Sequence, residues 1–250
     1  MDDVVTATVA AIRAKIPCLG QAALGPEYSY HSLPLCVIDA VFSIGVRYRN
    51  AQKAVDSWCA AQTPNWPKER IAGESRHAIT DLTRATDGFE GVALAERFFG
   101  GNRQRTSSRR GILKADAVVQ FAKALQHAGV DDFADIQNAA RVERACEAVR
   151  SIAAQGSGLS FRYFLMLAGD KASVKPDRML CRFVEEATGR PGIPSRSACD
   201  AVVGAARVLA AEFPNLTPRL LDHLIWSCQR ARPASKFGAA ASRAAAKMAG

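Results

Sequence analysis

The chain has 250 residues, of which 48% are apolar, so it is long enough to bury one large core or two smaller ones. It carries 33 Lys and Arg against 24 Asp and Glu, and the formal charge of +9 fits a polyanionic partner as well as a merely basic surface. Seven cysteines without a C-x-x-C pair argue against a disulfide scaffold, a zinc finger and an iron–sulfur cluster.

The spacing of apolar residues predicts helices throughout the chain. Alanine is abundant and β-branched alternation is scarce, and both features favour an all-α fold. In chain order, we expect helices at residues 3–16, 35–47, 50–62, 76–86, 88–99, 113–128, 131–138, 140–154, 159–168, 178–187, 196–213 and 217–230. The Ala-rich stretch 233–250, with scattered Lys and Arg, is expected to be frayed or disordered.

A basic segment without acidic residues lies between Glu96 and Asp116. It contains Arg97, Arg103, Arg105, Arg109, Arg110 and Lys114. Such a segment can follow the phosphates of a nucleic acid, but charge runs are more often simply solvated. The pattern alone therefore leaves both interpretations open.

The segment 143–184 carries the most informative pattern in the chain. One predicted helix ends, Gly156-Ser157-Gly158 turns the chain, and the next helix begins. The two glycines allow a positive φ and a close backbone approach, and the free amides at the start of the second helix suit a DNA phosphate. Many helical proteins contain such a turn, so taken alone it indicates a structural role more readily than a functional one.

Together with the residues that follow it, this turn resembles the helix-hairpin-helix DNA glycosylase superfamily, which includes endonuclease III and the adenine mismatch glycosylases. In that family an Asp downstream of the hairpin opens another helix, which carries an Arg five positions later; Asp177 and Arg182 match. The helix at 37–48 resembles the family's early core helix, whose final turn inserts into DNA. Ser43 matches the serine of that turn, but Gly45 stands where a Gln is usual.

The resemblance, which covers roughly residues 34–185, implies an all-α, two-lobed glycosylase of base-excision repair. Residues 32–171 would form a bundle ending in the hairpin, and residues 1–31 with 172–232 a second lobe. A damaged or mispaired base, flipped out of the duplex, would be cut from its deoxyribose by hydrolysis. Asp177 would stabilise the positive charge that develops on the sugar and orient a water; the alternative, compatible with catalysis, is that it caps the next helix.

Four other residues are candidates for the same site. Asp39 is a lone carboxylate in an apolar helix, where the resemblance implies an acid that protonates the leaving base; a partly exposed or Arg-paired Asp is equally consistent. Arg47 and Tyr48 stand where the family places its wedge into the gap left by the flipped base, or at an ordinary helix end. Lys175 would contact phosphate, act as a displaced amine nucleophile, or remain solvated.

Two departures from the family pattern bear on the chemistry. Bifunctional members carry a nucleophilic Lys two positions after the second hairpin glycine, and Ser160 occupies that position here. The four-cysteine cluster motif of some members is also absent. We therefore expect hydrolysis by water, no metal or organic cofactor, and DNA contacts from Gly156, Ser157, Gly158 and Ser160.

The sequence leaves three function classes in view: a DNA glycosylase, a non-catalytic helix-hairpin-helix DNA-binding protein, and a helical protein–protein scaffold. For the first, the partner would be double-stranded DNA that contains a lesion or mismatch, bound by a monomer. No apolar run reaches the length of a membrane span, and the acidic start is unlike a signal peptide. These features predict a cytoplasmic, DNA-associated protein without membrane contact.

Overall fold

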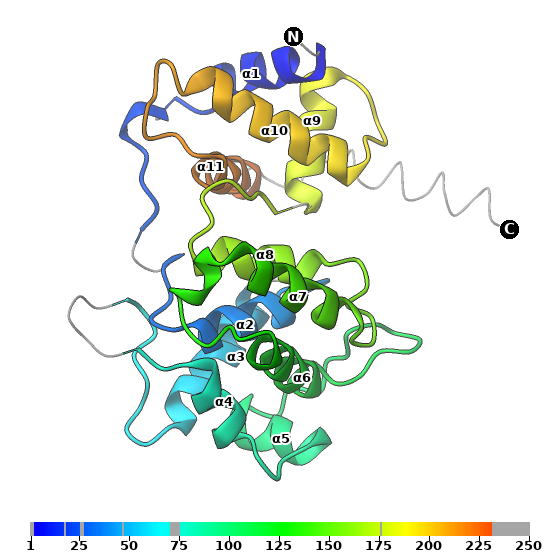
Figure 1. Ribbon diagram of the computed structural model, residues 1–250. Coiled ribbons are helices and arrows are strands. Elements are labelled where there is room, and N and C mark those ends of the chain that lie inside the picture. Colours follow the sequence, from blue (N-terminus) through cyan, green and yellow to red (C-terminus); the bar gives the residue numbers. More distant parts are fainter. Residues whose placement is uncertain are drawn as a thin grey trace, which may run out of the picture. The chain divides into compact units, whose positions relative to one another are not determined.

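Figure 1 shows the computed structural model, which describes residues 3–17, 19–25, 28–46, 48–70, 76–175 and 177–231. These residues form eleven α-helices and no β-strand, apart from two isolated bridges between single residues. The all-α fold expected from the sequence is thus confirmed. Among the described helices, none has the length and apolarity needed to cross a membrane. The tail predicted at 233–250 lies outside the described residues.

The chain divides into two compact units. The first unit combines residues 1–22 with residues 176–250, and the second consists of residues 23–175. Tyr30 and Lys175 make their contacts within the second unit, so that unit extends further at both ends than the lobe expected at 32–171.

The second unit is built around a helix that is buried along its whole length. This helix, α2 (Leu33–Phe42), has no exposed residue, as expected for a segment that is apolar on every side. Six further helices in the described part of this unit follow α2 in the chain: α3 (Tyr48–Ala61), α4 (Ile79–Ala85), α5 (Gly91–Phe98), α6 (Lys114–His127), α7 (Ala139–Arg150) and α8 (Leu159–Ala168). Helices α3, α4, α6 and α8 all pack against α2. Large aromatic side chains fill the remaining core: Phe42, Trp58, Phe99, Phe121 and Phe164.

The described residues of the first unit form four helices, which come from two segments that are distant in the sequence. Its helices are α1 (Asp3–Lys15), α9 (Arg178–Thr188), α10 (Ser195–Leu209) and α11 (Pro218–Ala231). Helix α1 packs against α9 and α10, and α11 packs against the same two helices. The apolar residues of α9 recur every three or four positions, which turns Leu180, Phe183 and Val184 toward one side, where they are buried.

Three helices end four or five residues earlier than the apolar pattern predicts. The helix expected at 35–47 is α2 and ends at Phe42, where the amine of Lys114 binds the carbonyl of Phe42 and that of Ile44 just beyond the helix. The helix expected at 140–154 is α7 and ends at Arg150, because the chain takes a left-handed conformation at Ala154 (φ 62°). The helix expected at 196–213 is α10 and ends at Leu209, ahead of a proline that disfavours helical geometry in the residue before it.

The helix expected at 131–138 is absent, apart from one short 3-10 turn at Asp135–Gln137. The aspartate side chains of this segment accept hydrogen bonds from backbone amides, in place of the carbonyl groups that would accept them in a helix. The carboxylate of Asp135 accepts hydrogen bonds from the amides of Asp131 and Asp132, at 2.8 and 3.1 Å. Short acidic side chains compete with helical hydrogen bonds in this way, which explains why the apolar pattern was misleading here.

Candidate functional site

The turn between α7 and α8 is the helical hairpin that the sequence predicts. Gly158 is the residue before α8 and has φ 69° and ψ 7°, in the left-handed region that favours glycine. Gly156 does not adopt a positive φ; the second left-handed residue of the turn is Ala154. Arg150, at the end of α7, donates a hydrogen bond of 3.1 Å from Nε to the carbonyl of Gly156 and so ties the turn to the helix before it.

The residues of the turn differ in what they offer to a ligand. Gly156 and Ser157 are exposed, whereas the amides of Gly158 and Leu159 donate hydrogen bonds to the Gln155 carbonyl and the Ser157 hydroxyl, at 2.9 and 3.4 Å. Ser160, for which we expected a DNA contact, is buried, and its hydroxyl donates a hydrogen bond to the side chain of Gln155. Its side chain therefore stabilises the hairpin from inside and presents no group to the surface.

A second group of polar residues surrounds the C-terminal half of α2; we call it the Asp39 cluster, formed by Tyr30, Asp39, Ser43, Lys114, Tyr163 and Lys175. Asp39 is fully buried, and its Oδ2 accepts a hydrogen bond of 2.7 Å from the Tyr30 hydroxyl. Its Oδ1 is buried without a hydrogen-bond partner among the described residues. The sequence left open whether Asp39 was exposed or buried, and the structure places it in the core.

Burial raises the pKa of the Asp39 carboxyl, because a charged carboxylate loses its hydration in the core. The hydrogen bond from Tyr30 and the charges of Lys175 and Lys68 oppose this shift but do not cancel it. Burial, followed by Asp39 and Tyr48, raises the pKa of the Tyr30 hydroxyl as well. Asp39 thus keeps its proton at higher pH than a solvated Asp does, while the Tyr30 hydroxyl donates its hydrogen bond to Oδ2.

Lys175 lies inside the second unit beside Asp39. Its Nζ is 3.4 Å from the Ser43 hydroxyl and 3.6 Å from the centroid of the Tyr163 ring, a cation–π contact. The structure thus brings Lys175 next to Asp39 and Ser43, which lie far earlier in the sequence, at the end of α2. The phosphate contact expected for Lys175 stays a prediction, and its amine already has partners in the unit.

Lys114 belongs to the basic segment that the sequence singled out, but its position differs from that of a surface lysine. It is buried, and its Nζ donates hydrogen bonds to the carbonyls of Phe42 and Ile44, at 3.0 and 2.7 Å. Burial, with a smaller contribution from Lys175, lowers its pKa to about 8. Nothing in the charge pattern distinguished this lysine from its arginine neighbours, because its role depends on contact with a helix some seventy residues earlier in the chain.

The remaining site residues lie elsewhere. Tyr48 is half-buried at the start of α3 and close enough to Tyr30 to affect its pKa, whereas Arg47 lies outside the described residues. Asp177 caps α9 in the first unit: its Oδ1 accepts hydrogen bonds from the amides of Met179 and Leu180, at 2.8 and 3.0 Å. Arg182, the arginine that matches the glycosylase pattern, donates a hydrogen bond to the side chain of Gln229 and so connects α9 with α11.

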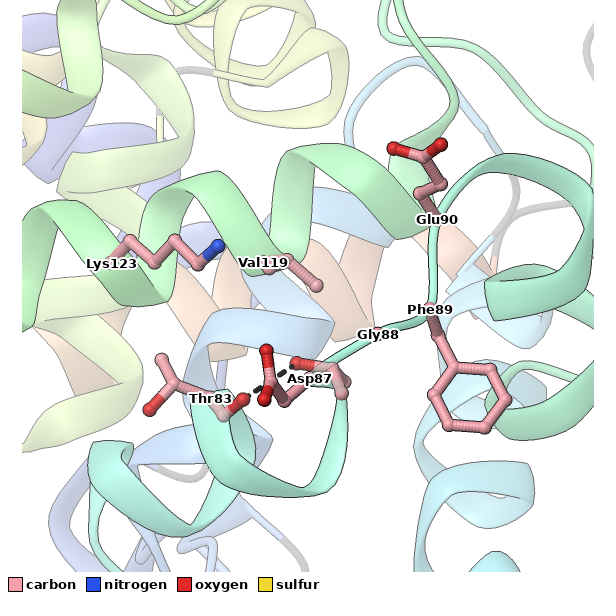
Figure 2. A pocket seen from close by; sticks show the side chains of 8 residues that line it. Thr83, Asp87, Gly88, Phe89, Glu90, Val119 and Lys123 are labelled. Carbon is pink, nitrogen blue, oxygen red and sulfur yellow. Dashed lines mark hydrogen bonds between the residues drawn. The ribbon is translucent and has the colours of Figure 1, made fainter.

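The described part of the chain contains no group of three or more His, Cys, Asp or Glu side chains arranged to hold a metal ion. A surface pocket of about 300 Å³ lies in the second unit, where Figure 2 shows Val119 and Lys123 of α6 near Thr83 and Asp87. None of the candidate site residues that were predicted from the sequence lines this pocket.

Comparison with known proteins gives a family but no function. Residues 7–230 match DUF8548, a domain of unknown function, and the match spans helices of both units. No curated protein and no solved structure matches the chain.

The hairpin geometry predicts different effects for its two glycines. Gly158→Ala should lower the free energy of unfolding by about 1–2 kcal/mol, because an L-residue is strained at a φ of 69°. Gly156→Ala is the matched control: its Cβ would meet only the Arg150 carbonyl oxygen at 3.7 Å, so stability should stay the same or rise by up to about 1 kcal/mol. Urea unfolding of both variants measures the difference, and equal losses would contradict the assigned backbone geometry.

Proposed function

The chain belongs to the DUF8548 family, and we propose that it is a monofunctional DNA glycosylase, which hydrolyses the N-glycosidic bond of a flipped damaged or mispaired base. The observation that carries the proposal is the succession of α7, a turn with left-handed Gly158, α8, and a helix capped by Asp177. This order is the one by which the sequence resembles the helix-hairpin-helix glycosylases. The two-lobed architecture of that superfamily is part of the same proposal.

The hairpin would bind the phosphate backbone. The exposed Gly156 and Ser157 present hydrogen-bond donors in front of α8, and the positive end of the helix dipole favours an anion. Phosphate contacts position a duplex without reading its sequence. This arrangement suits an enzyme that must search undamaged DNA for one altered base.

The reaction needs a base that leaves and a water that replaces it at C1′ of the sugar. The bond between C1′ and the base nitrogen breaks, and its electron pair departs with the base. Asp177 would stabilise the positive charge on the sugar and accept a proton from the attacking water. Its Oδ1 is engaged by the helix cap, whereas Oδ2 accepts no hydrogen bond from the described residues and is the oxygen assigned to this role.

The departing base needs a proton, and Asp39 would supply it. Its raised pKa keeps the carboxyl protonated into the pH range where a solvated Asp is ionised, and Oδ1 has no partner to which the proton is committed. Because Asp39 is fully buried, the base can reach Oδ1 only when the side chains around it move. Opening of the Asp39 cluster would therefore be part of base recognition.

A non-catalytic DNA-binding protein is the second candidate. It is favoured by the cap hydrogen bonds that already account for Asp177 and by the complete burial of Asp39. Base release from modified duplexes separates the two candidates. Absence of salt-dependent duplex binding would instead favour the helical protein–protein scaffold.

Asp177→Asn should abolish base release and leave DNA affinity and stability nearly unchanged. The amide cannot stabilise charge at C1′ as a carboxylate does, but Asn caps a helix as well as Asp does. Asp177→Ala should lose base release and also about 1 kcal/mol of stability, because the cap is removed. A panel of duplexes with uracil, alkylated, deaminated or oxidised purines, or mismatches identifies the substrate. Near-normal turnover of Asp177→Asn on that substrate would show that the catalytic assignment is wrong.

The rate of base release should fall as the pH rises through the raised pKa of Asp39, because only the protonated carboxyl can donate. In Asp39→Asn this fall should vanish and the rate should drop by roughly a factor of 100 or more. The same pKa shift means that ionisation opposes folding, so the stability of wild type relative to Asp39→Asn should decrease as the pH rises from the usual pKa of an Asp to the raised pKa of Asp39, and then level off. A falling limb that persists in Asp39→Asn would assign it to another group.

Hydrolysis by water predicts that no covalent intermediate forms. With Ser160 in place of the nucleophilic lysine, borohydride should not trap the protein on its substrate duplex, and the abasic site should stay intact. Lys175 is the amine to control for, since it lies next to Asp39. A cross-linked band that disappears in Lys175→Ala would make Lys175 the nucleophile and overturn the monofunctional assignment.

A further inference from the structure

The connection between α5 and α6 forms a tight loop, residues 103–113, which we call the arginine loop. Its two sides are joined by hydrogen bonds from the amide of Thr106 to the carbonyl of Ile112, at 2.9 Å, and from the amide of Lys114 to the carbonyl of Gln104, at 2.8 Å. The bend requires a glycine, since a Cβ on Gly111 would lie 2.1 Å from the amide nitrogen of Ser107. The loop is therefore a closed structure and not a random connection.

The arginine loop lies against the helical hairpin. The hydroxyl of Thr106 donates a hydrogen bond of 3.2 Å to the carbonyl of Ala153, in the turn between α7 and α8. The same hydroxyl accepts a hydrogen bond from the amide of Ile112, so one side chain closes the loop and anchors it. In Figure 1 the loop projects from the second unit on the side where α7 turns into α8.

The two neighbouring segments share a charge pattern that the sequence alone did not connect. Neither 97–115 nor 148–169 contains an Asp or a Glu. Within the loop, Arg103 pairs with Glu96, and Arg105 folds back to donate a hydrogen bond to the Gly111 carbonyl.

Two arginines at the tip of the loop remain without such contacts. Arg109 and Arg110 are exposed, and within the described part of the chain their guanidinium groups take part in no ion pair or hydrogen bond. Several cations elsewhere in the chain do have carboxylate partners, among them Arg13, Lys68 and Arg141. The tip is thus an uncompensated positive charge on a loop that is anchored to the turn between α7 and α8.

We propose that the arginine loop is a second phosphate-binding element, in which Arg109 and Arg110 bind the backbone of duplex DNA next to the phosphate held by the hairpin. This inference rests on the DNA binding of the proposed function but not on its catalysis. A guanidinium group matches phosphate geometry with paired donors, and the neighbouring Ser107 and Ser108 add hydroxyl donors. Residues 103–111 contain no apolar side chain, so the tip has nothing to bury in the core of a protein interface.

The test is the salt dependence of binding to an unmodified duplex. Each phosphate contact contributes about 0.9 to the slope of log affinity against log salt, so Arg109→Gln/Arg110→Gln should reduce the slope by about 1.8. The control is Arg84→Gln/Lys123→Gln, which removes two exposed charges of the same unit from α4 and α6. It should leave the slope close to that of wild type, and circular dichroism should show intact helices in both.

A second variant keeps the charges and disturbs the loop. Gly111→Ala places a methyl group against the backbone of Ser107, so the loop cannot stay closed. The slope should fall although both arginines remain. If this variant binds with an unchanged slope, the preformed loop is not the binding element.

The outcomes separate the two proposals. Equal slopes for the loop variant and its control would overturn the loop assignment alone. A loop-dependent slope without base release from any duplex would uphold the loop and overturn the glycosylase. A wild type that binds no duplex, or a loop needed only for vesicles of anionic lipid or for polyglutamate, would overturn the assignment to DNA.

Discussion

Burial of α2 on every side is the constraint on which the second unit depends. Helices α3, α4, α6 and α8 pack around it, so its polar groups can find partners only within the core. Tyr30 provides a donor for Asp39, and Lys114 provides donors for the carbonyls where the helix ends. An unsatisfied buried polar group costs about 1–3 kcal/mol, so these few contacts are a substantial part of what makes the apolar packing possible.

The same burial determines the charges in the Asp39 cluster. Asp39 favours its neutral form, whereas Lys114 and Lys175 bring two amines into the same small volume. Protonation of Asp39 therefore leaves no anion in the cluster to oppose them. The amine of Lys114 gives up its proton more readily than a solvated lysine, which limits the repulsion between the two.

Much of the secondary structure could be predicted from the sequence, because it depends on local patterns. Helix α8 begins and ends where the sequence predicts, since glycines stand on both sides of it. The pairing of Tyr30 with Asp39, the role of Lys114 and the contact of Thr106 with Ala153 could not be predicted, because each joins residues from separate elements. The acidic residues near 131–135 show the converse error, in which local side-chain hydrogen bonds outweigh an apolar pattern. The candidate site was thus predicted as single residues, but not as the clusters in which they lie.

The first unit is assembled from two segments that are separated by the whole of the second unit. During synthesis on the ribosome, α1 emerges before α9 and α10, and it has no partner in its unit until they have been made. The second unit is continuous and can fold in the meantime. The order of synthesis therefore favours a sequence of events in which the hairpin and the core around α2 form first, and α1 packs against α9 and α10 last.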